Sequence, residues 1–109
     1  YPALADSPEK PLVDKYMGGR GSSILSFGIQ GGREAGAKFI DALQLVTRLV
    51  NIGDAKSLAC HPATTTHRQL SAAELAKAGV SEDLVRLSIG IEHIDDILAD
   101  LEHALAAAR

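Results

Sequence analysis

The stretch DLVRLSIGIEH, residues 83 to 93, places a single arginine, Arg86, within an otherwise apolar and small-residue segment. Its side chains alternate between apolar and small or polar, which is the period of a half-buried strand. One face would carry Val85, Leu87 and Ile89, and the other Arg86, Ser88 and Gly90. A guanidinium is costly to bury without a partner. The stretch therefore predicts a strand whose second face borders something that pairs with Arg86.

Two more strands are predicted before this one. Residues 24–30, ILSFGIQ, alternate in the same way and end at two glycines. Residues 56–60, KSLAC, form a short, mostly apolar run.

Three helices separate and follow these strands. Residues 34–50 carry apolar side chains at helical spacing, and Asn51 and Gly53 are expected to end that helix. Residues 71–78 open with Ser71 and Glu74 in the S-x-x-E pattern of a capping box. Residues 93–108 form the clearest amphipathic helix. The order predicts an α+β domain: a mainly antiparallel sheet covered by helices on one face.

The first 23 residues differ from the rest of the chain. They hold three of the four prolines and three of the ten glycines and show no sustained period. We therefore expect residues 1–23 to form an extended lead-in or linker, and residues 24–109 to form one domain.

Composition argues against several partners and sites. The net charge is −3 and the eleven Lys and Arg residues are spread along the chain, so no nucleic acid is expected. No apolar run approaches the roughly 18 residues of a bilayer span, so we expect no membrane partner. A single cysteine fits a reducing compartment, so we expect a cytoplasmic location. Cys60 is the single cysteine. With His61 and His67 it does not match the usual zinc spacings, so no metal site is expected; the two histidines are interpreted as anchors of a loop and Cys60 as a packed strand thiol.

From the pattern alone, two interpretations of Arg86 stay open. A guanidinium on a face of small residues is suited to hold a carboxylate or phosphate through two parallel hydrogen bonds. It could equally form a buried ion pair with a carboxylate of the same chain. The spacing of residues does not separate these alternatives.

Two long motifs carry a family resemblance. Residues 50–71, VNIGDAKSLACHPATTTHRQLS, and residues 79–101, GVSEDLVRLSIGIEHIDDILADL, resemble the C-terminal domain of the Cys/Met-metabolism family of pyridoxal-phosphate (PLP) enzymes. Within that family, residues 31–58 and the TTTH run at 64–67 are most similar to the O-acetylhomoserine sulfhydrylases.

The resemblance implies the small C-terminal domain of an aspartate-aminotransferase-like (fold type I) enzyme, whose large domain carries the PLP lysine. The five lysines of this chain lack the Ser-x-Thr-Lys context of that residue. The resemblance therefore implies no catalytic or cofactor-binding residue here, an inactive fragment, and an active full-length enzyme that is a homotetramer.

The resemblance also assigns three substrate contacts. Arg86 matches the family arginine that binds the substrate α-carboxylate, and Asn51 matches a position that makes a second contact to that carboxylate. Thr66 matches a threonine near the carboxylate and the arginine. The implied reaction is γ-replacement, in which O-acetylhomoserine and sulfide or a thiol give homocysteine or methionine and acetate. The alternatives are a cystathionine γ-synthase or methionine γ-lyase relative, and a non-catalytic amino-acid-binding module.

Overall fold

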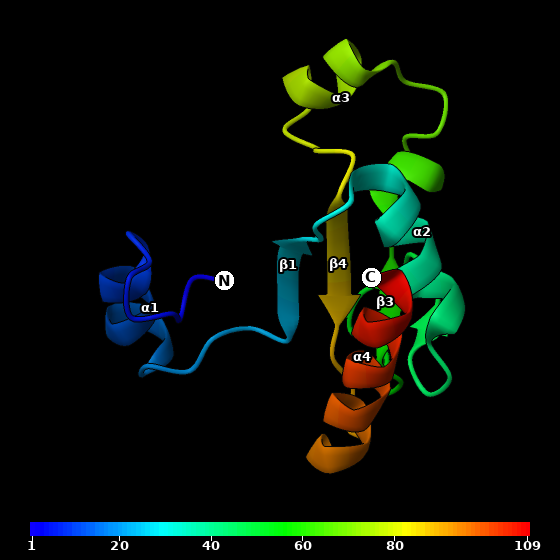
Figure 1. Cartoon of the computed structure of the whole chain (residues 1–109). Helices are drawn as coiled ribbons and strands as arrows, with labels where there is room; N and C mark the ends of the chain where they lie inside the picture. The colour runs from blue at the N-terminus through cyan, green and yellow to red at the C-terminus, as the bar shows by residue number, and fades with distance from the viewer.

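The structure is a computed structural model that describes residues 1–109 apart from the side chain of Ala72. Its centre is a four-stranded sheet in the order β1-β4-β3-β2 (Figure 1). The strands are β1 (Ile24–Gly28), β2 (Thr47–Arg48), β3 (Leu58–Cys60) and β4 (Leu84–Ser88). β4 pairs antiparallel with β1 and β3, and the edge strand β2 pairs parallel with β3. The predicted α+β class and mainly antiparallel sheet are confirmed.

Two helices, α2 (Gly32–Ala42) and α4 (Ile94–Ala108), lie together on one side of the sheet (Figure 1). The core forms between them and the sheet. Phe39 of α2 is fully buried, and its ring meets Phe27 of β1 edge-on with centroids 5.7 Å apart. Val85 and Leu87 of β4 are buried in the same core, as the alternation of residues 84–88 predicts. The opposite face of the sheet therefore carries Arg86.

The first core helix is shorter than predicted. It was expected to reach residue 50, but α2 ends at Ala42 and residues 47 and 48 form β2. The reason is Asp100 of α4, whose carboxylate accepts hydrogen bonds from the backbone N–H groups of Gln44, Leu45 and Val46 at 2.8, 3.0 and 2.9 Å. These amides are held by another helix and are not available to extend α2.

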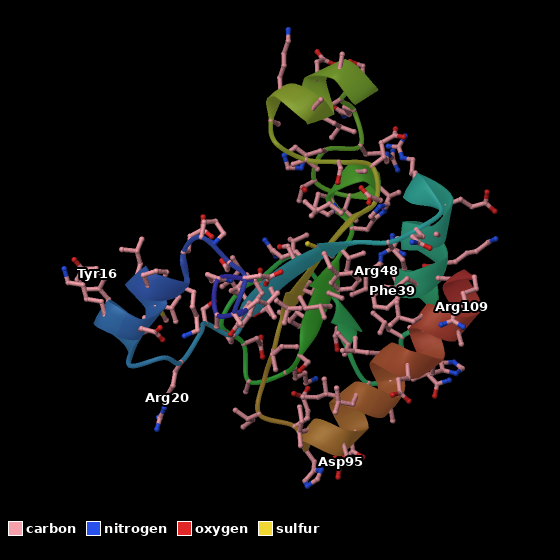
Figure 2. The ribbon with its side chains drawn as sticks, turned by 60° about the vertical axis from the view of Figure 1, so that its left-hand side comes forward. Tyr16, Arg20, Phe39, Arg48, Asp95 and Arg109 are labelled. Carbon is pink, nitrogen blue, oxygen red and sulfur yellow. The ribbon has the colours of Figure 1, made fainter. Side chains whose placement is uncertain are left out.

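The expectation of an extended lead-in is wrong for residues 10–17, which form α1 (Lys10–Met17). Pro11 lies in its first turn, where a missing N–H costs nothing, and Gly18 ends it with a left-handed φ of 59°. Val13 is the buried residue of this helix. Tyr16 points away from the sheet on this segment (Figure 2). The helix stands apart from the sheet and its two covering helices (Figure 1).

Two short elements connect β3 to β4: the 3-10 turn η1 (Pro62–Thr64) and α3 (Ala72–Lys77). The predicted capping box is confirmed: Ser71 Oγ accepts from the N–H of Glu74, and the Glu74 carboxylate accepts from the N–H of Ser71. Among the residues that the structure describes, no helix is long and apolar enough to cross a membrane.

Gly36, inside α2, is required by a close approach to His61. A Cβ there would lie 2.5 Å from His61 Nε2, and the ring cannot retreat because both of its nitrogens are hydrogen-bonded. Helix propensity alone predicts that Gly36→Ala stabilises the fold by about 1 kcal/mol. We expect the opposite sign, a loss of about 1–3 kcal/mol of unfolding free energy from overpacking.

Urea denaturation of the 109-residue chain measures this difference. Lys38→Ala is the control, because Lys38 is exposed on the same helix and pairs only with the exposed Glu34. A variant Gly36→Ala as stable as the wild type would contradict the close approach.

Candidate functional site

Arg86 lies at the middle of β4, one of the two inner strands of the sheet. In register it faces Ser26 of β1 on one side and Cys60 of β3 on the other, and all three side chains project from the face opposite the helices. Small neighbours leave room around the guanidinium, as the alternation of residues 84–90 predicts. The sheet thus holds one cation on a rigid element, which is a suitable base for a binding site.

The loop between β2 and β3, residues 49–57, contacts this face beside Arg86. The Arg86 Nη2 group donates to the backbone carbonyls of Val50 and Asn51, at 2.5 and 3.4 Å. The Nε atom is buried and has no hydrogen-bond partner among the described residues. The guanidinium is therefore oriented by two carbonyls while other donors stay unused.

A carboxylate of the same chain does not pair with Arg86 in the part of the chain that the structure describes. The ion pairs found there join Lys10 to Asp14, Lys38 to Glu34, Arg48 to Asp41 and His93 to Asp95. The interpretation of Arg86 as one half of an internal ion pair is therefore wrong. A cation with neutral partners is suited to receive an anion from outside the chain.

Asn51 lies next to Arg86, as the resemblance implies, but in a different local structure from the one predicted. It was expected to end a helix, whereas it lies in the 49–57 loop beyond β2. Its carbonyl accepts from Arg86, and its side chain is exposed. The structure therefore brings Arg86 and Asn51 together and leaves the Asn51 amide accessible to a ligand.

Thr66 is exposed in the loop after η1, and its hydroxyl lies 2.8 Å from His67 Nδ1. No hydrogen bond joins Thr66 to Arg86 or Asn51 among the described residues. The third predicted contact is therefore not assembled with the other two in this structure.

His61 anchors the loop that leads to Thr66. Its Nε2 lies 2.7 Å from the carbonyl of Glu82 and donates to it, and its Nδ1 lies 2.9 Å from Thr64 Oγ1. The anchoring role predicted for His61 is confirmed. The ring of His67 contacts the Thr66 hydroxyl instead of backbone, so the same expectation fails there. The described residues contain no group of three or more candidate metal ligands.

Cys60 is buried beside Arg86 in register, as expected of a packed strand thiol. Burial raises the pKa of its thiol, and the Arg86 charge offsets part of that rise. A thiol whose pKa is raised is mostly protonated at neutral pH and is a poor nucleophile.

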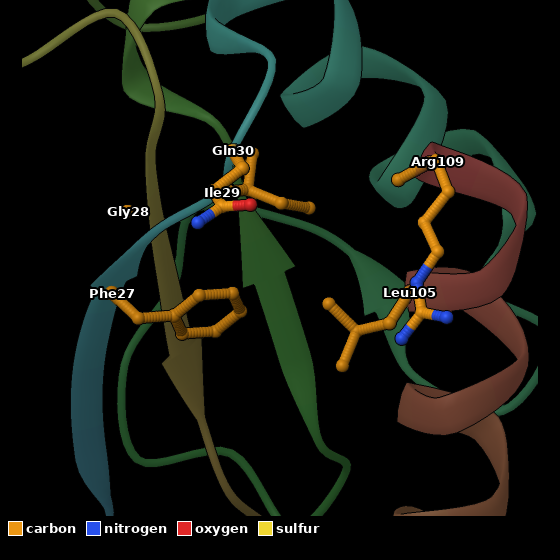
Figure 3. A pocket seen from close by; sticks show the side chains of 7 residues that line it. Phe27, Gly28, Ile29, Gln30, Leu105 and Arg109 are labelled. Atoms are coloured by element: carbon orange, nitrogen blue, oxygen red, sulfur yellow. The ribbon is translucent and has the colours of Figure 1, made fainter.

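A pocket of about 230 Å³ lies on the other side of the sheet, between β1 and the end of α4 (Figure 3). Phe27 and Leu105 face each other across it, and Gln30 and Arg109 lie at its edge (Figure 3). Because Phe27 belongs to the helix-covered face, this pocket is separate from the face of Arg86.

Sequence reasoning missed Ser57 and Glu92. The N–H and the hydroxyl of Ser57 donate to the Glu92 carboxylate at 2.6 and 2.8 Å. The two residues are 35 positions apart, and no local sequence pattern around either one predicts a contact with the other. Their contact lies at the base of the 49–57 loop that carries Asn51.

Comparisons with known proteins agree with the α+β fold. The Cys/Met metabolism PLP-dependent enzyme family matches residues 1–106. The chain belongs to this family.

Individual relatives have different activities. O-acetyl-L-homoserine sulfhydrylase 1 of Thermus thermophilus is 49% identical over 106 residues, which are 97% of this chain and 25% of the relative. L-methionine gamma-lyase of Pseudomonas putida is also 49% identical, over 99% of this chain and 27% of the relative. The chain thus spans about a quarter of the length of these relatives.

A solved structure gives the same fold. A protein of Campylobacter jejuni described as an O-acetylhomoserine (thiol)-lyase superposes with a TM-score of 0.85 at 44% identity, covering 97% of this chain and 25% of that one. That crystal structure contains N'-pyridoxyl-lysine-5'-monophosphate. The predicted fold, the C-terminal domain of a fold type I PLP enzyme, is confirmed.

Proposed function

We propose that this chain is the substrate-side domain of a PLP-dependent enzyme that converts O-acetylhomoserine and sulfide, or a thiol, to homocysteine or methionine and acetate. The observation that carries the proposal is Arg86, a cation that β4 holds on the face opposite the helices, with no carboxylate of the described chain paired to it. The sulfhydrylase relatives support the reaction.

The residues of this chain do not fit the covalent PLP site. Lys15, Lys38, Lys56 and Lys77 have exposed side chains. Lys10 is bound to Asp14, at 2.5 Å. The PLP lysine is placed in the large domain because none of the five lysines here has the Ser-x-Thr-Lys context of that residue in the family. When PLP is bound there it supplies the electron sink of the reaction.

The role of this chain is to hold the amino acid in place. The substrate carboxylate binds the donors of Arg86 that the carbonyls of Val50 and Asn51 do not use, and the Asn51 side-chain amide donates a further hydrogen bond. Thr66 supplies its hydroxyl as a further donor, as the family resemblance implies. Fixing one end of the substrate orients the bonds at Cα for reaction, which is worth several kcal/mol of the barrier.

A γ-lyase is the second candidate, because a methionine γ-lyase is as similar to this chain as a sulfhydrylase is. The resemblance to the sulfhydrylases favours replacement, since Asn51 occupies a position where the lyases usually have serine. A non-catalytic module is not favoured, because the relatives are PLP enzymes about four times as long.

The deciding experiment uses the full-length gene product. We expect it to absorb visible light as a PLP enzyme and to release acetate and homocysteine from O-acetylhomoserine only when sulfide is present. Release of ammonia and 2-oxobutanoate without sulfide would show a lyase. A product without PLP and without either activity would overturn the proposal.

We also propose that the full-length protein is a cytoplasmic homotetramer, as the family resemblance implies. Size-exclusion chromatography with light scattering of the holoenzyme tests the assembly. A monomeric holoenzyme would contradict it.

A further inference from the structure

The 49–57 loop is attached to the end of β4 by side chains from both segments. The Ser57 N–H donates to Glu92 Oε1 at 2.6 Å, and the Ser57 hydroxyl donates to Glu92 Oε2 at 2.8 Å. Ser57 Oγ also accepts from the Gly90 N–H at 2.9 Å. Ser57 is fully buried, so water does not replace these bonds when one is lost.

Further contacts continue the attachment on either side of Ser57. The Gly53 N–H donates to the buried Ser88 Oγ at 3.1 Å, and the Ile91 N–H donates to the Ala55 carbonyl at 3.0 Å. Gly90 allows this approach, since a Cβ there would lie 2.3 Å from the Ala55 carbonyl oxygen. Residues 53–57 and 88–92 therefore form one hydrogen-bonded unit.

This unit supports one end of the segment that touches Arg86. Val50 and Ile52 are 42% and 61% exposed, and Asn51 is exposed as well, so apolar packing does not fix these three positions. Hydrogen bonds hold this three-residue segment at both ends. Before it, the Leu49 N–H donates to the Ala59 carbonyl at 3.1 Å, and after it, the Gly53 N–H donates to Ser88 Oγ. The Val50 and Asn51 carbonyls keep their places over Arg86 through these attachments.

We propose that Glu92, through Ser57, is a positioning residue that holds the 49–57 loop over Arg86, so that the Asn51 amide and the guanidinium face the substrate carboxylate together. This inference rests on the proposed function of Arg86. Glu92 itself does not touch the substrate, because its two oxygens are occupied by Ser57.

The charge of Glu92 strengthens the contact. Hydrogen bonds from the Ser57 N–H and hydroxyl lower the pKa of the Glu92 carboxyl, and the charge of Lys56 lowers it further. The carboxylate is therefore ionised at neutral pH, and its two bonds to Ser57 are of the stronger, charge-assisted kind. A neutral amide of the same shape is a weaker partner. Its oxygen accepts from the Ser57 N–H, but its NH₂ group requires the Ser57 hydroxyl to turn and accept, and the charge is lost.

The test is Glu92→Gln in the full-length holoenzyme. We expect KM for O-acetylhomoserine to rise about tenfold while kcat changes by less than about twofold, as for a loss of ground-state binding. We also expect amide hydrogen exchange to become faster in peptides that cover residues 50–57. Glu102→Gln is the matched control, because Glu102 is exposed on α4 outside this unit.

A second variant, Ser57→Ala, covers the case in which Glu92→Gln does not fold. It removes the hydroxyl bonds to Glu92 and Gly90 and keeps the backbone bond, so we expect a smaller rise in KM, about threefold, with the same local increase in exchange.

The outcomes separate this inference from the proposed function. Unchanged exchange at residues 50–57 in the folded variants overturns the positioning role. Faster exchange with an unchanged KM in the Glu92 and Ser57 variants also overturns the positioning role. If KM is raised in Arg86→Ala at the same time, the proposed function still stands. If Arg86→Ala leaves KM unchanged, the proposed function falls and the positioning role falls with it.

Discussion

Arg86→Ala in the full-length enzyme is expected to lower kcat/KM for O-acetylhomoserine by roughly 10- to 150-fold. The variant loses a charged contact with two parallel hydrogen bonds, worth about 1.5–3 kcal/mol, and each 1.4 kcal/mol is about a factor of ten. PLP binding should change little, because we propose that the cofactor lysine lies outside this chain. Steady-state kinetics and the visible absorbance of the purified variant measure the two effects separately.

Two further variants make the prediction specific. Arg86→Lys keeps the charge but loses the planar fork, so we expect a kcat/KM between those of the wild type and Arg86→Ala. Arg20→Ala removes an exposed arginine of the N-terminal segment, far from β4, and should have no effect (Figure 2). Wild-type kcat/KM in Arg86→Ala would show that the substrate carboxylate binds elsewhere.

The strand that carries Arg86 could be predicted because its signal is local. Alternation over residues 84–88 shows which side chains are buried, and the structure buries Val85 and Leu87 as expected. The same alternation places Arg86 on the face opposite the helices. The capping box at Ser71 is also local, since both partners lie within one helical turn.

The parts that the sequence did not predict depend on distant residues. The end of α2 is determined by Asp100, more than 50 positions away from the amides that it binds. The Ser57–Glu92 contact likewise joins two common polar residues that no short pattern connects. By contrast, the missed α1 had local signals: Pro11 in the first turn and Gly18 after the last are typical helix boundaries.

Thr66 shows a different limit. The resemblance assigns it to the carboxylate site together with Arg86 and Asn51, but no hydrogen bond joins it to either residue among those described, and its hydroxyl lies 2.8 Å from His67 Nδ1. A motif identifies residues that act together in a complete enzyme, whereas their approach also depends on the ligand and on the surrounding domain. The role of Thr66 therefore stays a prediction.

Asp100→Ala is expected to cause the largest loss of stability, about 3 kcal/mol or more of unfolding free energy. Asp100 is 7% exposed, and its two oxygens accept from the backbone N–H groups of three consecutive residues, Gln44, Leu45 and Val46. Without the carboxylate, the N–H of Val46 is left in a buried site and the connection from α2 to β2 loses its support. Urea denaturation of the 109-residue chain, followed by far-UV circular dichroism, measures the loss.

Asp100→Asn keeps one accepting oxygen, so it should lie between the wild type and Asp100→Ala, whereas Glu102→Ala on an exposed part of α4 should be close to the wild type. A loss below about 1 kcal/mol in Asp100→Ala would mean that these amides find other acceptors. In that case Asp100 would not be the reason that α2 ends at Ala42. Another interaction would have to explain why the helix does not continue to residue 50.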